Sequence, residues 1–197
     1  MALPASAQGT VEQVIDACVS ISNGLKTGSD DKLKSGLGAL KSHDVKPFSN
    51  LRPMSGETID LDGHLLFDEE FVDSLIVNRL AMKEARRYAK IRKSRAGGSA
   101  KGCRMDTYAI EGGKAVTFKT SARGAKKIAI VGEPDGLFSL RITEKSGKVL
   151  YTDTDDVKTG RSVRVADFKL PENAASTILI EVSNRGKLDK SFAIITN

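Results

Sequence analysis

The fold is decided by the stretch Ile178-Leu-Ile-Glu-Val-Ser-Asn184-Arg-Gly-Lys-Leu-Asp-Lys-Ser-Phe192-Ala-Ile194. Every second position in its first half is apolar from Ile178 on, and Phe192 and Ile194 repeat the pattern in its second half. Alternate side chains of a strand point to the same face. The Asn184-Arg-Gly sequence between the two halves is a turn signal. The stretch therefore predicts two strands joined by a tight turn, each with a buried face.

The same alternation extends back to about Tyr108. It recurs at Val116 and Phe118, at Ile128 and Ile130, at Phe138, Leu140 and Ile142, at Val149 and Tyr151, and at Val163 and Val165. Turn signals such as Glu133-Pro-Asp-Gly and Lys145-Ser-Gly-Lys separate the segments. Seven or eight short strands within about 90 residues predict an antiparallel β-sandwich, jelly-roll-like, over residues 106–197.

The first part of the chain has helical rather than strand patterns. Thr10 and Gln13 form a capping box ahead of an apolar stripe, and Gly24 is a plausible stop for that helix. Ser29 can cap a second helix, and residues 43–58 are expected to form a loop. The Asp62-Gly63 pair predicts a β-hairpin over residues 58–67.

Asp68 is expected to cap the strongest helix, which runs to about Arg95. Its predicted core face carries Val77, Ala81, Ala85 and Tyr88. Residues 97–105 are rich in glycine and are expected to form a linker. The sequence thus predicts an α+β protein: an N-terminal segment 1–7, a helical region 8–96 with one hairpin, the linker, and the sandwich 106–197.

The N-terminal residues indicate a compartment. Leu3-Pro-Ala-Ser-Ala7-Gln is typical of the end of a secretory signal peptide, which predicts cleavage after Ala7 and a periplasmic or extracellular location. The alternative is a disordered terminus. No apolar run approaches the roughly 18 residues of a transmembrane helix, and no cysteine follows the predicted cleavage site to carry a lipid.

Two cysteines leave two interpretations open. In an exported protein, Cys18 and Cys103 can form a disulfide that ties the first helix to the domain junction. Alternatively, Cys18 is a buried apolar residue and Cys103 an exposed thiol in a glycine-rich loop. With only His43 and His64 in addition, they make no zinc pattern.

Basic residues are concentrated between residues 83 and 104, where nine lysines and arginines accompany one acidic residue, Glu84. The whole chain has a net charge of +6, so the rest of it carries no net positive charge. Helical spacing places four of them in one basic stripe with the preceding Arg79: Arg79, Lys83, Arg86, Lys90 and Lys93. Such a stripe can bind an anionic partner, and the alternative is a solvated helix face. Because no nucleic-acid-binding motif accompanies it, an anionic glycan or another surface component is favoured over specific binding of nucleic acid.

An acidic loop follows the predicted strand that ends near Thr152. Its carboxylates, on Asp153, Asp155 and Asp156, are of the kind that bind Ca²⁺, with Glu133 or Asp135 as additional ligands from another loop. The alternative is a polar turn at one end of the sandwich, which needs no metal.

Residues 115–197 resemble the bacterial pre-peptidase C-terminal domains. The similar segments are Leu137-Phe-Ser-Leu-Arg-Ile-Thr, Lys145-Ser-Gly-Lys-Val-Leu, Asp153-Thr-Asp and the closing hairpin from Ile180 to Ile194. The resemblance implies a jelly-roll-like sandwich that is appended to secreted proteins and acts as an accessory or binding module. It also implies Ca²⁺ binding through Asp153, Asp155 and Asp156, as in some relatives.

No nucleophile with a base and an orienting group is visible in the sequence. The favoured interpretation is an exported, non-enzymatic binding or interaction protein that binds through a loop end of the sandwich or through the basic stripe. One alternative is a hydrolase whose site is assembled only in three dimensions, with His64 and Asp60 or Asp62. Another is a structural assembly subunit with a large exposed apolar patch.

Overall fold

The computed structural model describes residues 6–43, 45–48, 51–59, 65–79, 103–121, 127–153, 165–171 and 177–197. In chain order the elements are α1 (Ser6–Thr27), α2 (Asp30–Ser42), β1 (Arg52–Ser55), α3 (Glu69–Arg79), β2 (Arg104–Ile110), β3 (Ala115–Ser121), β4 (Lys127–Gly132), β5 (Phe138–Glu144), β6 (Val149–Asp153), β7 (Val165–Lys169), β8 (Thr177–Asn184) and β9 (Lys190–Thr196). The predicted α+β class and antiparallel sandwich are confirmed. No helix in these residues is long and apolar enough to span a membrane.

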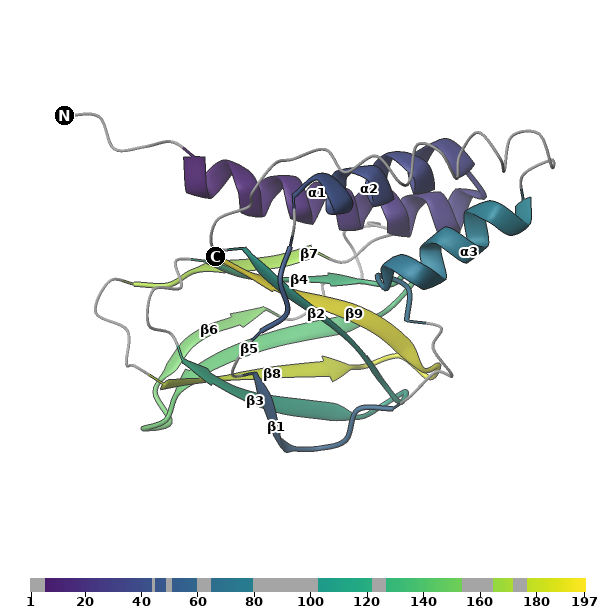
Figure 1. Ribbon diagram of the computed structural model, residues 1–197. Coiled ribbons are helices and arrows are strands. Elements are labelled where there is room, and N and C mark those ends of the chain that lie inside the picture. The colour runs from purple at the N-terminus through teal and green to yellow at the C-terminus, as the bar shows by residue number, and fades with distance from the viewer. Residues whose placement is uncertain are drawn as a thin grey trace.

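The strands form two antiparallel sheets. One has four strands in the order β2-β9-β4-β7, and the other has five in the order β1-β3-β8-β5-β6. From β2 onward the chain changes sheets after every strand except at the β5–β6 hairpin, as Figure 1 shows. This is the strand order of a jelly roll, to which β1 adds one further edge strand.

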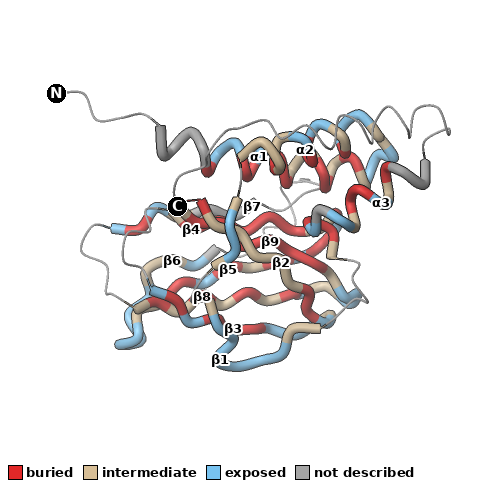
Figure 2. Tube along the Cα trace, viewed as in Figure 1, coloured by how far each residue is buried: buried red, intermediate tan, exposed pale blue. Residues whose placement is uncertain are grey.

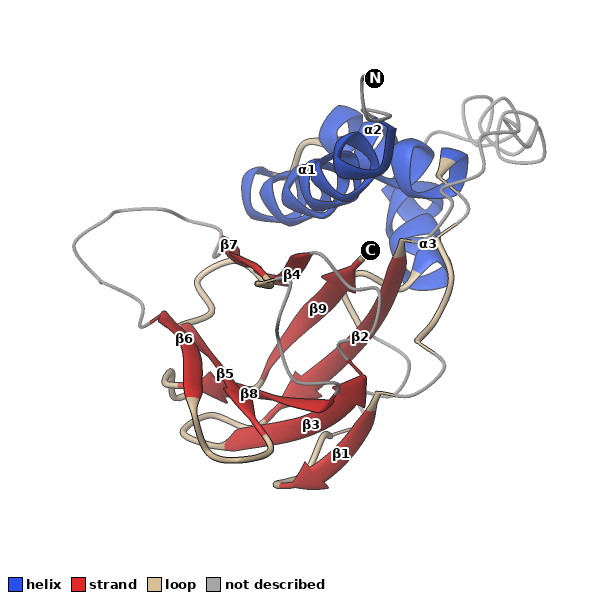
Figure 3. Cartoon of the chain, turned by 90° about the vertical axis from the view of Figure 1, so that its left-hand side faces the viewer, coloured by secondary structure: helices blue, strands red, loops and turns tan. Residues whose placement is uncertain are grey.

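The molecule has three layers, with the helices over the four-stranded sheet and the five-stranded sheet beneath it (Figure 3). Ala129 and Val131 of β4 belong to the apolar core shared with the helices. Their neighbours Ile128 and Ile130 belong to the second core, between the sheets. The middle strands of the four-stranded sheet are therefore buried on both faces (Figure 2), which explains the unbroken apolar run at the end of β9.

The first helix extends beyond both of its predicted ends. Gly24 does not stop α1, because α2 packs directly on it: a β-carbon at Gly24 would lie 2.8 Å from the Leu33 amide nitrogen. The chain reverses at Gly28 instead, with φ of +67°, a conformation that glycine adopts without cost. Ser29 caps α2 as predicted, accepting a hydrogen bond from the Lys32 amide at 3.4 Å.

Asp68 caps α3 as predicted. Its Oδ1 accepts hydrogen bonds from the amides of Glu70 and Phe71, at 2.9 and 3.0 Å. Val72 and Ile76 in the first turns are fully buried. The predicted continuation of this helix to Arg95, the face from Val77 to Tyr88 and most of the linker 97–105 lie outside the residues whose side chains are described.

The segment after α2 differs from the predicted loop. It crosses the edge of β2, where the Met105 amide donates to the Lys46 carbonyl at 2.9 Å, and then forms β1 against β3. The hairpin predicted over residues 58–67 is wrong in its described part. Ile59 forms a bridge to Ala109 of β2. Phe67 lies in a turn and not in a strand, and its side chain is buried in the core beneath the helices.

The inward positions predicted for most strands are confirmed, with one exception. Val149 is 46% exposed, whereas Tyr151 packs on the sandwich core. The register of β5 against β6 shifts between Ile142 and Thr143, which places Val149 opposite the outward-facing Thr143. Such a bulge reverses the face of every residue beyond it. Val165 begins β7, and Val163 lies outside the described residues.

Candidate functional site

The structure tests few of the predicted site residues. Of the basic stripe, only the backbone of Arg79 is described, at the end of α3, and Lys83, Arg86, Lys90 and Lys93 lie outside the described residues. The same holds for the acidic loop: Asp153 ends β6, and Asp155 and Asp156 lie outside. His64, Asp60 and Asp62, the residues of the hydrolase alternative, also lie outside.

The two additional carboxylates considered for Ca²⁺ are engaged within the protein. Glu133 accepts hydrogen bonds from the amide and the hydroxyl of Ser191, both at 2.9 Å, and forms an ion pair with Lys190 at 3.1 Å. Asp135 pairs with Lys26 of α1 at 2.7 Å. In the described part of the chain, no three histidine, cysteine, aspartate or glutamate side chains gather as metal ligands do.

The loop end near Glu133 is rigidly built. The buried Asn184 side chain donates to the carbonyls of Ile110 and Leu188, at 3.2 and 2.8 Å, and accepts from the Gly186 amide at 3.0 Å. A β-carbon at Gly112 would lie 2.3 Å from the backbone of Lys187. The loop between β2 and β3 and the loop between β8 and β9 are thus held together, and their polar groups serve the fold.

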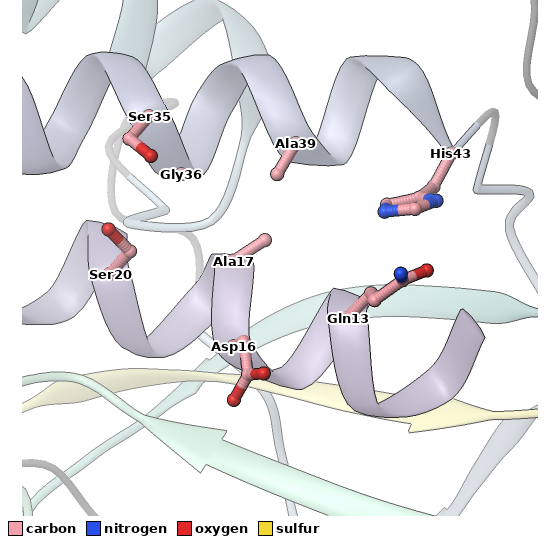
Figure 4. Close-up of a pocket in the computed structure, with 8 residues that line it drawn as sticks. All are labelled: Gln13, Asp16, Ala17, Ser20, Ser35, Gly36, Ala39 and His43. Carbon is pink, nitrogen blue, oxygen red and sulfur yellow. The ribbon is translucent and has the colours of Figure 1, made fainter. Parts of the chain in front are cut away.

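A shallow cleft of about 230 Å³ lies between α1 and α2. Its walls approach closely because Ala17, Gly36 and Ala39 are small. Figure 4 shows Gln13 and His43 facing one another across it, with Asp16 turned away from α2. His43 thus faces an amide rather than a nucleophile.

Asp106 and Tyr108 form a partly buried pair on β2, an edge strand of the four-stranded sheet. The Tyr108 hydroxyl and the Phe48 amide both donate to the Asp106 carboxylate, at 3.3 Å. Burial raises the pKa of Asp106, and these two hydrogen bonds oppose the rise. Burial also raises the pKa of Tyr108, and the neighbouring carboxylate raises it further. The Tyr108 ring packs on Phe118 at 4.6 Å, so the pair helps to join the sheets.

Both cysteines are free and buried. Cys18 donates to the Met105 sulfur at 3.6 Å, and burial raises the pKa of its thiol, with a further contribution from Cys103. Burial also raises the pKa of Cys103, to about 11. The disulfide of the first interpretation is not observed. Of the second interpretation, the buried Cys18 is observed, but Cys103 is buried and not exposed.

The two sheets differ in what covers their outer faces. Helices cover the four-stranded sheet, whereas β3 and β8 of the five-stranded sheet alternate strictly between buried side chains and more exposed ones. We call the outward side chains of the five-stranded sheet the open face. Its hydroxyl groups come from four strands: Thr117 of β3, Ser183 of β8, Ser139 and Thr143 of β5, and Thr152 of β6.

The open face carries its charges in two places. Arg52 of β1 lies directly opposite Lys119 of β3, and both are exposed. Arg141 of β5 lies directly opposite Glu181 of β8. Leu179, beside Lys119 on β8, is an apolar position in the same row. No aromatic side chain points outward from the strands of this sheet that are described; Phe118 and Phe138 are buried inside the sandwich.

The apolar alternation in the sequence predicts only the inward residues, and the outward ones are visible only as their complement. The pairing of Arg52 with Lys119 joins strands from opposite sides of the predicted linker, so no local pattern indicates it.

Solved structures match this chain at low sequence identity, most of them over about half of its length. The chain is similar to the mitogen derived from Yersinia pseudotuberculosis, with a TM-score of 0.35 and 8% identity over 49% of this chain and 85% of that one. It is also similar to the lectin domain of lectinolysin, solved with Lewis b antigen (TM-score 0.31, 10% identity, 46% of this chain and 70% of that one). A third is Aeromonas hydrophila PliG, a periplasmic inhibitor of g-type lysozyme (TM-score 0.33, 15% identity, 51% and 92%). No protein-family model and no curated protein sequence matches the chain.

Proposed function

We propose that this protein is an exported, non-enzymatic binding module that recognises a glycan on the open face of the five-stranded sheet. The observation that supports it is the asymmetry between the sheets. The middle strands of the four-stranded sheet are buried on both faces, and the five-stranded sheet keeps a hydroxyl-rich outer face.

The chemistry of the open face suits a sugar. Serine and threonine hydroxyls both donate and accept hydrogen bonds, as sugar hydroxyls do. Thr117 and Ser183 lie on adjacent central strands, where the backbone is fixed by pairing on both sides. Sites on paired strands hold their groups more precisely than sites on loops. The surface is therefore preformed, and little conformational entropy is lost when a ligand binds to it.

Two further features favour binding over catalysis and export over retention. His43 faces Gln13, and the two serines that line the α1–α2 cleft, Ser20 and Ser35, lie at its other end. The Ala5-Ser-Ala7 sequence favours processing by a signal peptidase.

A glycan array with neutral and acidic members tests the proposal. Thr117→Gln with Ser183→Gln adds neutral bulk to the open face, and Gly38→Gln adds a neutral glutamine side chain on α2, where a β-carbon meets nothing within 4 Å. We expect the face variant to lose binding by about tenfold or more, which corresponds to roughly 1.4 kcal/mol, and the α2 variant to bind as the parent protein does. Absence of binding to every glycan, or equal binding by both variants, would contradict the proposal.

A further inference from the structure

We infer that Arg52 and Lys119 bind the acidic group of a sparsely charged acidic glycan, such as a uronate-containing chain. This inference rests on the proposed function and assigns to it a ligand class and a contact point. Arg52 lies on β1 and Lys119 on β3, far apart in the sequence, and only the pairing of these strands in the sheet brings them together.

The register places both side chains on the open face. Lys119 is exposed between the buried Phe118 and Thr120, so it points outward. Arg52 is its direct partner across the strands and is exposed as well. Side chains that are directly opposite in an antiparallel pair have their β-carbons about 5 Å apart. A single carboxylate or sulfate can therefore be reached by both cations.

Folding alone does not account for this arrangement. Like charges directly opposite one another destabilise a sheet. Neither Arg52 nor Lys119 forms an ion pair with any residue that the structure describes. An anion between them would remove the repulsion, and charge-assisted hydrogen bonds from arginine to a carboxylate are about twice as strong as neutral ones.

The surroundings favour a sugar acid over a dense polyanion. Leu179, next to Lys119 in the row, offers an apolar surface for the C–H face of a sugar ring, and Thr143 follows it with a hydroxyl. Glu181 lies in the adjacent row, two residues from Leu179. A glycan with an acidic group on every sugar would place one of them beside the Glu181 carboxylate, which would repel it. A glycan with widely spaced acidic groups avoids this repulsion.

Lys119→Glu is the decisive variant. It replaces a repelling pair with an attractive one, so the fold should be retained and the melting temperature unchanged or higher. Lys32→Glu is the matched control, because it makes the same charge change on an exposed residue of α2, away from the open face. Titration calorimetry with an oligosaccharide that carries one uronate among neutral sugars gives the affinity, and its methyl ester removes the charge while keeping the sugar. The same neutral backbone with one sulfate ester tests sulfate as the alternative acid.

We expect parent protein to bind at least one of the two acidic oligosaccharides, and Lys119→Glu to lose about tenfold or more in affinity, since it removes a charge-assisted hydrogen bond and places a like charge beside the ligand's acid. Esterification should have a similar effect, and Lys32→Glu should change the affinity little. Binding should weaken with salt, because exposed charges are screened within about 8 Å at physiological ionic strength.

Three results would overturn the inference: equal binding of free and esterified oligosaccharide, unchanged binding by Lys119→Glu, or an equal loss of binding in Lys32→Glu. If Thr117→Gln with Ser183→Gln abolishes binding of a neutral glycan and Lys119→Glu does not, the ligand class is wrong and the binding face stands. If no glycan binds, both fail.

Discussion

Gly36 of α2 lies against the backbone of α1, at a position where a β-carbon would be 2.7 Å from the carbonyl oxygen of Ala17. This contact sets the distance between the two helices, because backbone atoms cannot move aside as a flexible side chain can. Gly38, two residues further along the same helix, has nothing within 4 Å of the corresponding position. The two glycines therefore provide a matched test of interhelical packing.

We expect Gly36→Ala to lower the free energy of unfolding by about 1–3 kcal/mol, the usual cost of overpacking a core. Gly38→Ala should raise it by up to about 1 kcal/mol, because alanine is the better helix former. Urea denaturation of both variants measures the difference. Equal stabilisation by both would show that α1 and α2 are further apart than the structure places them.

Ile180→Asp tests the register of the central strand β8. Ile180 is fully buried in the sandwich core, so the substitution buries an unpaired carboxylate and should cost several kcal/mol, comparable with the stability of a whole domain. Leu188→Asp is the control, because Leu188 is 70% exposed and its change should stay within about 0.5 kcal/mol. Circular dichroism melting distinguishes them, and a parent-like melt for Ile180→Asp would place the strand one residue out of register.

Asp106→Asn should change how stability depends on pH. Because burial raises the pKa of Asp106, the folded state keeps this proton to higher pH than the unfolded chain does. The stability contribution of the protonated group is therefore fully present below about pH 4 and is lost as pH rises through the folded-state pKa. The asparagine variant lacks this loss, so its stability relative to parent protein should rise above pH 4 and then level off.

Tyr108→Phe serves as the companion variant for that measurement. The Tyr108 hydroxyl donates to the Asp106 carboxylate and lowers its pKa, so its removal should extend the loss of stability to higher pH. A difference between Asp106→Asn and parent protein that stays constant from pH 3 to pH 8 would show that Asp106 is solvated.

Thiol labelling tests the state of the two cysteines. With burial raising the pKa of Cys103 to about 11, roughly one molecule in a thousand carries its thiolate at pH 8. Native protein should therefore react slowly with iodoacetamide, and unfolded protein should incorporate two labels per chain. No labelling after unfolding without reductant would instead show a disulfide between Cys18 and Cys103.

The basic stripe remains a prediction from the sequence. Reversing Lys83, Arg86 and Lys90 to glutamate should reduce retention on heparin at low salt, with little change in melting temperature. Reversing Lys32, Lys114 and Lys187 makes the same change in net charge elsewhere, on exposed residues of α2 and the loop end. Equal retention of both variants would favour the solvated helix face.

The alternation of apolar residues was sufficient to predict the sandwich, because the two faces of a strand differ in solvent exposure and strand side chains have a period of two. Capping at Ser29 and Asp68 was predictable for a similar reason, since it depends on groups within one turn. The register shift between Val149 and Tyr151 was not predictable, because the apolar pattern of one strand does not show a bulge until its partner strand is known.

Most inward-facing residues, strands and helix N-caps are specified by the sequence alone, since those features depend on neighbours within a few residues. Only the tertiary structure decided that Gly24 continues a helix, that Phe67 is buried in a turn and that residues 52–55 join the sheet. It alone also decided which sheet the helices cover and hence which face stays open. These outcomes depend on contacts between segments far apart in the chain, such as Arg52 with Lys119, and pairwise geometry of that kind has no local sequence signal.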